Sequence, residues 1–489
     1  MLDSSREDAV ASLRGLLDTH RYAGPEATSA LGAPIGSEHR STDLPLYRRR
    51  LAEPTPLHTL IKLFALHATV PEADARRAFD PLPIEDLAAL GLVERAEGQV
   101  RPLVALAVAE GLILALDRPD PVTFAVQPDH VLGVSSPALL LARLTVRGAA
   151  GRVLDLGCGG GVQALLAARH AKSVVGVDLN PRALAFARFN ARLNGIRNVE
   201  WRQGDLFEPV AGERFDIVVS NPPYVVSPES WLLFRDGGGA GDGICARVVA
   251  GLGSHLAEGG FATVLANWAL REGEDWSLRP RRWVEGTGCD AWILRSETQD
   301  ALTYAAVWTR GPEAAGYLDA LDRWTAHYEA LGIRSLVMGA LVLRRRTGGS
   351  NWVRADDLPA PPDRDCSAAL LRVFAGEDRL RALRGDAALL DEVLRVAEPL
   401  RLRQTVAFRD GAPEVQEAEL SLADGLPLRG GADGGTIRLV QLCDGRRRLR
   451  EVVAEMARSS GTDAGELTGP TLAVARRLLA LGFLVPAER

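Results

Sequence analysis

The chain of 489 residues is too long for one hydrophobic core and predicts two or three domains. Its apolar fraction of 47% and charged fraction of 25% are those of an ordinary soluble protein, and a net charge of -6 gives no global signal for nucleic-acid binding. No apolar run approaches the length of a membrane span and no signal-peptide pattern opens the sequence, so we expect a cytoplasmic protein without a membrane partner.

Residues 1–125 predict an N-terminal accessory domain. An amphipathic helix is expected over 7–20, and further helices over 57–64 and 72–79. A helical stretch over 84–90 ends at a glycine and leads into two short strands, which is similar to a winged-helix unit. Such units bind nucleic acid or pack against partner domains, and the sequence leaves both interpretations open.

Ser135, Ser136 and Pro137 precede the next predicted helix. A serine here is expected to cap the helix, with the proline in its first turn. Proximity to a cofactor is compatible with this capping role.

Residues 153–161 predict a strand and a glycine-rich turn that lead into a helix. Glycines let the backbone pass close to a ligand, and a helix amino terminus offers free N–H groups. A second strand, 173–177, ends in Asp178, where an acidic side chain can accept both hydroxyls of a ribose. A third strand, 199–203, leads to another carboxylate, that of Asp205.

A fourth apolar strand, 215–220, ends in Asn221-Pro222-Pro223-Tyr224. The two prolines turn the chain rigidly and leave the asparagine amide and a proline carbonyl free to accept hydrogen bonds. The tyrosine ring offers a flat stacking surface, so a planar primary amine or amide fits this segment. Ligands of open α/β sheets bind beyond the carboxyl ends of the strands, and four successive strand ends carry polar side chains here, namely Asp155, Asp178, Asp205 and Asn221.

Together these motifs resemble a class I S-adenosylmethionine-dependent methyltransferase of the Asn-Pro-Pro-Tyr group. The release-factor glutamine N5-methyltransferases and their ribosomal-RNA and adenine N-methyltransferase relatives are the most similar, over residues 130–265. The resemblance implies S-adenosyl-L-methionine as cofactor, held by Asp155, Gly157, Gly159, Asp178, Asp205 and Leu206. It also implies that the next segment is catalytic through Asn221, Pro222 and Tyr224 and holds the substrate through Asn221, Pro223 and Tyr224. Residues 236–243 resemble the glycine-rich segment that follows the catalytic loop in the glutamine enzymes.

The implied fold is α/β, a Rossmann-like seven-stranded methyltransferase sheet whose last strand is antiparallel to the others. Apolar runs predict its remaining strands over 261–266, 291–295 and 335–343, with an amphipathic helix over 314–331 before the last one. We therefore expect the methyltransferase domain over 126–347.

A C-terminal accessory domain is predicted over 348–489, after a linker at 347–350. Its last helices end in glycine before an apolar strand, which is again winged-helix-like, and a structural cap or a substrate-reading module would fit. The five cysteines show no metal-ligand spacing, so no metal is predicted, and their odd number argues against a disulfide framework. Cys158 is expected to be a small buried residue, and arginine clusters such as 344–346 are expected to be solvated surface.

The sequence therefore predicts an S-adenosylmethionine-dependent N-methyltransferase that acts on a planar nitrogen without a general base. A protein glutamine side-chain amide is favoured because basic charge is missing, and the alternative is an exocyclic amine of adenine or guanine in rRNA, tRNA or DNA. An NAD-dependent oxidoreductase and a non-catalytic binding protein are the competing classes. Asn221, Tyr224 and Asp205 argue against them. Composition and motifs leave the oligomeric state open.

Overall fold

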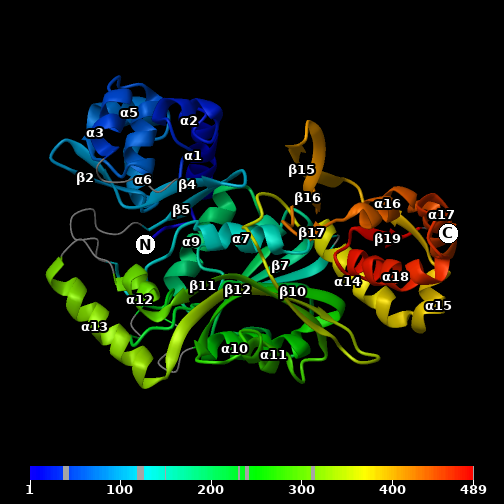
Figure 1. The fold of residues 1–489 in the computed structure, drawn as a ribbon. Helices are drawn as coiled ribbons and strands as arrows, with labels where there is room; N and C mark the ends of the chain where they lie inside the picture. Colours follow the sequence, from blue (N-terminus) through cyan, green and yellow to red (C-terminus); the bar gives the residue numbers. More distant parts are fainter. Residues whose placement is uncertain are drawn as a thin grey trace. The chain divides into compact units, whose positions relative to one another are not determined.

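The computed structural model describes residues 1–36, 43–117, 126–148, 150–229, 232–236, 242–309, 314–423 and 425–487. Contacts divide the chain into two compact units, whose helices and strands are labelled in Figure 1. The first unit comprises Met1–Ala142 and Arg147–Asp356, and the second comprises Arg143–Val146 and Asp357–Arg489. The three domain ranges expected from the sequence remain a proposal.

The first unit is built on an eight-stranded sheet with the order β13-β11-β12-β10-β9-β6-β7-β8. The pairs within β8-β7-β6-β9-β10 are parallel, whereas β12 is antiparallel to both of its neighbours. The α/β fold with its seven-stranded methyltransferase sheet is therefore confirmed, with one strand added. The strands are β6 (Ala150–Leu156), β7 (Ala171–Asp178), β8 (Val199–Gln203), β9 (Phe215–Ser220), β10 (Leu256–Arg271), β11 (Cys289–Asp300), β12 (Ile333–Arg345) and β13 (Val353–Asp357).

The added strand, β13, lies beyond the linker that was expected at 347–350. It is held at the β11 edge, where the Ala291 backbone N–H donates to the Trp352 carbonyl at 2.8 Å and Trp292 Nε1 donates to Asp356 Oδ2 at 2.7 Å. Four successive residues of this edge strand are partly buried and the last is exposed, so its sequence carries no clear apolar pattern.

Helices cover both faces of the sheet, with α7 and α9 on one side and α10 and α11 on the other (Figure 1). Helix α9 begins at an Asn180 cap, whose side chain accepts from the Arg182 N–H at 2.9 Å, with Pro181 in its first turn. None of the helices in the described ranges is long and apolar enough to span a bilayer. The helical segments of this region are α7 (Ser136–Leu144), α8 (Val162–Ala167), α9 (Pro181–Leu193), η3 (Glu208–Val210), α10 (Gly243–His255), α11 (Leu278–Val284), α12 (Ala301–Thr309) and α13 (Ala314–Ala330).

The N-terminal part contains the expected winged-helix arrangement. Its elements follow the order helix, strand, two helices and two strands, and the strands form a sheet of order β1-β3-β2. Glu97 and Gly98 both have positive φ values, of 51° and 71°, as a tight two-residue hairpin between β2 and β3 requires. The elements are α1 (Glu7–Thr19), α2 (Pro25–Leu31), α3 (Leu44–Arg50), α4 (Pro56–Leu60), η2 (Ile61–Ala65), β1 (Val70–Pro71), α5 (Glu72–Phe79), α6 (Ile84–Ala89), β2 (Val93–Ala96) and β3 (Gln99–Pro102).

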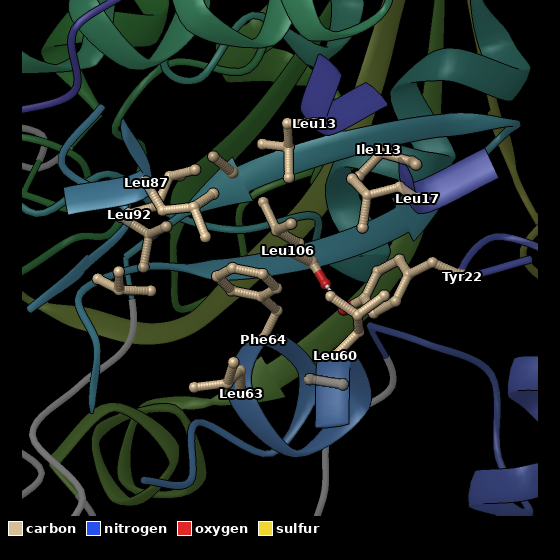
Figure 2. Close-up of a cluster of buried hydrophobic side chains, with 14 of the residues drawn as sticks. Leu13, Leu17, Tyr22, Leu60, Leu63, Phe64, Leu87, Leu92, Leu106 and Ile113 are labelled. Carbon is tan, nitrogen blue, oxygen red and sulfur yellow. Dashed lines mark hydrogen bonds between the residues drawn. The ribbon is translucent and has the colours of Figure 1, made fainter. Parts of the chain in front are cut away.

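One buried apolar cluster joins this N-terminal part to the central sheet. A hairpin of β4 (Ala105–Ala109) and β5 (Leu112–Leu116) contributes Leu106 and Ile113 to it, next to Leu13 and Leu17 of α1 (Figure 2). The hydroxyl of the buried Tyr22 donates to the Leu106 carbonyl at 2.8 Å. Phe186, Phe189 and Leu193 of α9 belong to the same cluster, so the N-terminal part and the sheet share a core.

The second unit has a small antiparallel sheet of order β18-β14-β19 and a separate hairpin of β15 and β16 that β17 extends. Its C-terminal order of helix, strand, two helices and strand is winged-helix-like, as expected, with β14 as the middle strand. The elements are α14 (Ser367–Ala382), α15 (Gly385–Leu390), β14 (Val393–Val396), β15 (Leu400–Arg409), β16 (Ala412–Leu422), β17 (Arg429–Gly431), α16 (Gly434–Leu442), β18 (Asp444–Arg448), α17 (Leu449–Ser460), α18 (Ala464–Ala480) and β19 (Leu484–Pro486).

Candidate active site

A cleft of about 280 Å³ opens at the carboxyl ends of the central strands of the sheet. Parallel strands bring their carboxyl ends to one edge, which is why residues far apart in the chain meet here. Eight of the ten residues that the sequence predicted for the site line this cleft. They are Asp155, Gly157, Gly159, Asp178, Asp205, Leu206, Asn221 and Pro223.

The glycine turn after β6 exposes its backbone to the cleft. Gly157 and Gly159 have φ values of 73° and 52°, which glycine adopts without strain. Apart from the chain neighbours, no described residue has a heavy atom within 4 Å of the position that a Cβ would take at either glycine. The Gly157 and Cys158 N–H groups both donate to the Val177 carbonyl, at 2.8 and 2.9 Å, and thereby fix the turn to the end of β7. A ligand can therefore approach the backbone of this turn closely.

Asp178, at the end of β7, receives two backbone hydrogen bonds. Its Oδ2 accepts from the Gly159 N–H at 2.7 Å and its Oδ1 from the Asn180 N–H at 2.8 Å. Burial raises the pKa of Asp178, and these backbone donors oppose the rise. A carboxylate has about four lone-pair sites, so both oxygens keep acceptor capacity for two hydroxyls.

Asp155 is fully buried within β6 and lies below the glycine turn. Its Oδ2 accepts from the Ala164 N–H in the first turn of α8, at 2.8 Å. Burial raises its pKa to about 7, and the negative charge of Asp178 adds to this rise. Asp155 thus lines the cleft and also orders the helix that follows the glycine turn.

Asp205 and Leu206 form the cleft wall after β8. The Asp205 carboxylate is partly exposed and accepts from Arg247 Nη2 of α10 at 2.7 Å. One of its oxygens is therefore held in place while the other can accept from an amine in the cleft. Leu206 has a positive φ of 45°, which fixes the turn of the chain at this wall.

Asn221 carries an unsatisfied acceptor. Its Oδ1 is buried and has no hydrogen-bond partner among the residues that the structure describes, and the side chain lines the cleft. The strand end below it is fixed by the Ser220 hydroxyl, which donates to the Leu156 carbonyl at 2.8 Å. Because buried polar groups are nearly always paired, this oxygen is available to a hydrogen-bond donor that enters the cleft.

Pro222 and Tyr224 are not among the residues that line the cleft. Pro222 is buried, and the Tyr224 side chain packs against apolar residues of both neighbouring clusters, with a pKa that burial raises to about 12. In this structure the ring therefore packs against buried apolar side chains on the side of the segment away from the lining of the cleft. The predicted stacking role of Tyr224 remains a proposal.

The sequence indicated only in part the segment that lines the cleft before α7: residues 133–137 were expected near a cofactor, whereas residues 130–132 were not indicated. His130, Leu132 and Gly133 line it, and burial lowers the pKa of His130. The segment is tied to the sheet side, since Asn180 Nδ2 donates to the Asp129 carbonyl at 2.8 Å. It is tied to the opposite side by the Leu233 N–H, which donates to the Pro128 carbonyl at 3.2 Å. Residues 130–132 lie on irregular backbone without any period, so no sequence pattern indicated them.

Ser135 combines the two roles that were considered for it. Its hydroxyl accepts weakly from the Ala138 N–H, at 3.4 Å, in the first turn of α7, and the residue also lines the cleft. Asp236 and Phe234, which follow the Asn-Pro-Pro-Tyr segment, line the cleft as well. Residues 237–241 of the segment that resembles the glycine-rich stretch of the glutamine enzymes lie outside the described residues. The described residues contain no cluster of potential metal ligands.

Two family models match the chain. Residues 134–274 match the model described as methyltransferase small domain, and residues 11–103 match one described as a domain of unknown function (DUF7059). The first match covers the glycine turn, the three following strand ends and the Asn-Pro-Pro-Tyr segment. The resemblance to class I S-adenosylmethionine-dependent methyltransferases is therefore confirmed for this part of the chain.

Three curated relatives show the same similarity. The chain is 49% identical over 76 residues to a release factor glutamine methyltransferase of Aliivibrio fischeri, a match that covers 15% of this chain and 27% of the relative. It is 32% identical over 186 residues to the protein of the same name from Geobacter sulfurreducens, covering 32% of this chain and 65% of the relative. To ribosomal RNA small subunit methyltransferase C of Alcanivorax borkumensis it is 35% identical over 123 residues, covering 25% of this chain and 34% of the relative. The chain thus spans less than two thirds of the length of each relative.

Proposed function

We propose that the chain, whose residues 134–274 carry a methyltransferase small domain, transfers a methyl group from S-adenosylmethionine to the side-chain amide of a protein glutamine. The unpaired Oδ1 of Asn221 carries the proposal. Leaving a buried acceptor unsatisfied costs about 1–3 kcal/mol, a cost that a bound amide N–H would remove. A primary amide has two such donors, and the proline carbonyls beside Asn221 can accept the second.

The residues of the cleft fit the cofactor. The open backbone at Gly157 and Gly159 admits its methionine part, Asp178 can accept from its ribose diol, and Asp205 from its adenine amine. S-adenosylmethionine, when bound, supplies an already activated sulfonium methyl group.

The task left to the protein is alignment. An amide nitrogen is a poor nucleophile, because its lone pair is conjugated with the carbonyl. Hydrogen bonds from the amide N–H groups to Asn221 and a proline carbonyl favour a pyramidal nitrogen and direct its lone pair at the methyl carbon. Bonds that tighten in this geometry stabilise the transition state more than the ground state. The new nitrogen–carbon bond replaces the carbon–sulfur bond, the thioether product leaves, and the methylated nitrogen loses one proton to water, so no general base is assigned to this step.

The charge of the N-terminal winged-helix unit also supports a protein substrate over a nucleic acid. Its third helix, α6, carries Glu85 and Asp86. Arg76 and Arg95, which face this helix, are both ion-paired with Glu72 and Glu85, at 2.6–3.1 Å. Phosphate recognition needs free basic side chains, so this arrangement favours packing against a protein.

A nucleobase amine is the second candidate, since one relative is named as a ribosomal RNA methyltransferase. The same pair of acceptors at Asn221 would orient an exocyclic amine of adenine or guanine in RNA or DNA. We propose the cytoplasm as the location for either substrate. An NAD-dependent oxidoreductase is disfavoured because the Asn-Pro-Pro-Tyr segment has no role in hydride transfer, and a titration with both cofactors would separate the two classes.

The acceptor can be identified with tritium. The purified chain is incubated with S-adenosylmethionine labelled at the methyl group and a lysate of cells that lack the gene. We expect label that resists nuclease, is released by protease, and appears as N5-methylglutamine after complete enzymatic digestion or as methylamine after acid hydrolysis. Label that nuclease releases would move the acceptor to a nucleobase. Absence of label from every fraction, with the cofactor bound, would support a non-catalytic binding protein and contradict the proposal.

A further inference from the structure

Two helices, α12 and α13, are inserted between the sixth and seventh strands of the methyltransferase sheet, β11 and β12. Figure 1 shows them as a helical pair beside the sheet. They contact each other, and α12 also contacts β11 and β12. In the sequence these helices come well after the cleft motifs. In the structure they contact the residues that follow Asn221.

The insertion packs against the Asn-Pro-Pro-Tyr segment and the two residues that follow it. The Tyr328 hydroxyl of α13 donates to the Val226 carbonyl at 2.6 Å, two residues after Tyr224. On α12, the buried Tyr304 hydroxyl accepts from Asn267 Nδ2 of β10 at 2.9 Å. Val225 and Val226 are buried in one apolar cluster with these tyrosines, and Tyr224 packs against it. The insertion is thus one packed body with the acceptor segment.

The same helices hold the wall that follows this segment. The Arg235 guanidinium lies over the Trp324 ring of α13, 5.6 Å from its centroid, and pairs with Asp236 at 2.7 Å. The Val225 N–H donates to the Arg235 carbonyl at 3.0 Å. Asp236 lines the cleft, so contacts run without a break from α13 to the acceptor end of the site.

Apolar side chains lie on the outer surface of the insertion. Leu302 and Val307 on α12 are 56% and 53% exposed, and Leu318 on α13 is 61% exposed. Scattered exposed apolar side chains are ordinary, but here three of them lie on one pair of helices that adjoins a proposed active site.

The charge around these side chains is acidic. The described residues of this region, 296–309 and 314–332, contain five aspartates and glutamates against one arginine. Asp319 and Asp322 are exposed on α13 and have no ion-pair partner among the described residues, whereas Arg323 lies 3.6 Å from Glu229. A phosphate backbone would be repelled from this surface, and a peptide with apolar and basic side chains would be attracted to it.

We propose that the α12–α13 insertion is the docking surface for the substrate polypeptide, and that it takes a segment with apolar and basic side chains next to the acceptor glutamine. This inference rests on the proposed function, because it deepens the assignment of the acceptor. The apolar side chains supply contact area, the acidic ones select the charge of the segment, and Tyr304 and Tyr328 join the docking surface to the acceptor loop.

Initial rates of tritium transfer test the docking surface. The nuclease-treated protein fraction of a lysate from cells that lack the gene is titrated as substrate. The test variants are a Leu302→Asp, Leu318→Asp double variant and an Asp319→Lys, Asp322→Lys double variant. Leu46→Asp is the matched control, because Leu46 on α3 is 49% exposed and lies outside the insertion.

Both double variants are expected to need about tenfold more protein fraction for half-maximal rate, the scale of a lost interface anchor. Their maximal rate and calorimetric affinity for S-adenosylmethionine should match the wild type, as should both properties of the control. Half-saturation equal to that of the wild type overturns the docking surface while the proposed function stands. If the variants transfer label to an added RNA fraction at the wild-type rate and no label reaches protein, the surface does not bind a substrate polypeptide. If the wild type labels nothing, the proposed function fails and this inference fails with it.

Discussion

At the scale of single residues, Asp178 and Asn221 differ in how their polar atoms are satisfied. Asp178 receives two backbone N–H bonds and is held in one orientation before any ligand arrives. Asn221 keeps a buried oxygen without a partner. The first arrangement suits a cofactor-binding group, and the second suits a group whose hydrogen bond forms only with the substrate.

Replacing Asn221 tests the second role. Asn221→Ala should lower the turnover rate by about 100-fold or more, the scale of a lost transition-state hydrogen-bonding group, with cofactor affinity unchanged. Methyl-transfer kinetics and calorimetry on the same preparation separate the two effects. Full activity in the variant would reject the role of Asn221 in alignment.

Replacing Asp178 tests the first role. Asp178→Ala should weaken S-adenosylmethionine binding by about tenfold or more, because it removes charge-assisted acceptors for the ribose. Calorimetric titration measures this directly. An affinity equal to that of the wild type would refute the ribose contact.

Asp155 predicts a pH dependence of stability. Its pKa is about 7 in the folded protein against an ordinary 3.8, so the folded state binds the proton more tightly than the unfolded chain. Asp155 therefore lowers the free energy of unfolding increasingly as pH rises from 3.8 to about 7, and by a constant amount above that. Asp155→Asn keeps an oxygen that can accept from the Ala164 N–H and removes this charge.

Thermal unfolding of the cofactor-free protein checks the effect of Asp155. The asparagine variant should gain several degrees over the wild type at pH 8 and clearly less at pH 5. The wild type at each pH is the control. A difference between variant and wild type that is the same at both pH values would contradict the raised pKa.

Residue types at strand ends were the part of the site that could be predicted. Asp178, Asp205 and Asn221 each follow a recognisable apolar strand, so local sequence encodes both their chemistry and their position. His130 reaches the cleft only through tertiary contacts of an irregular segment, and nothing in its own sequence surroundings indicated this. Asp236 was indicated only by the resemblance of residues 236–243 to a glycine-rich family segment.

At the scale of elements, helix α9 connects the N-terminal part to the glycine turn. Asn190 Oδ1 accepts from the Ala115 N–H at 2.7 Å, and its Nδ2 donates to the carbonyls of Ala115, at 3.1 Å, and Gly160, at 2.9 Å. One turn later, Asn194 pairs in the same way with both backbone groups of Ile113, at 3.0 and 2.7 Å. The two side chains thus satisfy the free edge of β5, which would otherwise be buried unpaired.

Removing one of these side chains should uncouple the two parts. Asn190→Ala leaves the buried N–H and carbonyl of Ala115 without partners, so we expect a loss of about 2–4 kcal/mol in the free energy of unfolding and weaker cofactor binding. Asn351→Ala, at an exposed asparagine that donates to the Arg346 carbonyl, is the control. If urea unfolding shows the same loss in the free energy of unfolding for both variants, the hydrogen bonds of Asn190 do not couple the two parts.

Elements with strong apolar periods were predictable, and those without were not. All seven expected strands are present, because most of them contain continuous apolar runs that become buried in the sheet. The eighth strand, β13, is a half-exposed edge strand and gives no such signal. In the N-terminal part, a helix that ends at a glycine and the two short strands after it predicted the winged-helix-like order of elements.

At the scale of the whole molecule, two units are combined, and the first contains everything that the proposed reaction needs. Its N-terminal part contributes Leu13, Leu106 and Ile113 to a core that it shares with α9. The predicted helices and strands of residues 1–125 suggested an N-terminal accessory domain, but such patterns do not show which surfaces become buried together. The domain ranges and the role of the second unit therefore remain proposals.

The central claim is that the cofactor and a planar amide meet in one cleft at the strand ends. A crystal structure of the chain with S-adenosylhomocysteine, the product of methyl transfer, tests it most directly. We predict the ribose at Asp178, the adenine at Asp205 and the sulfur directed toward the side chain of Asn221. Product bound elsewhere, or with its sulfur turned away from Asn221, would contradict the account.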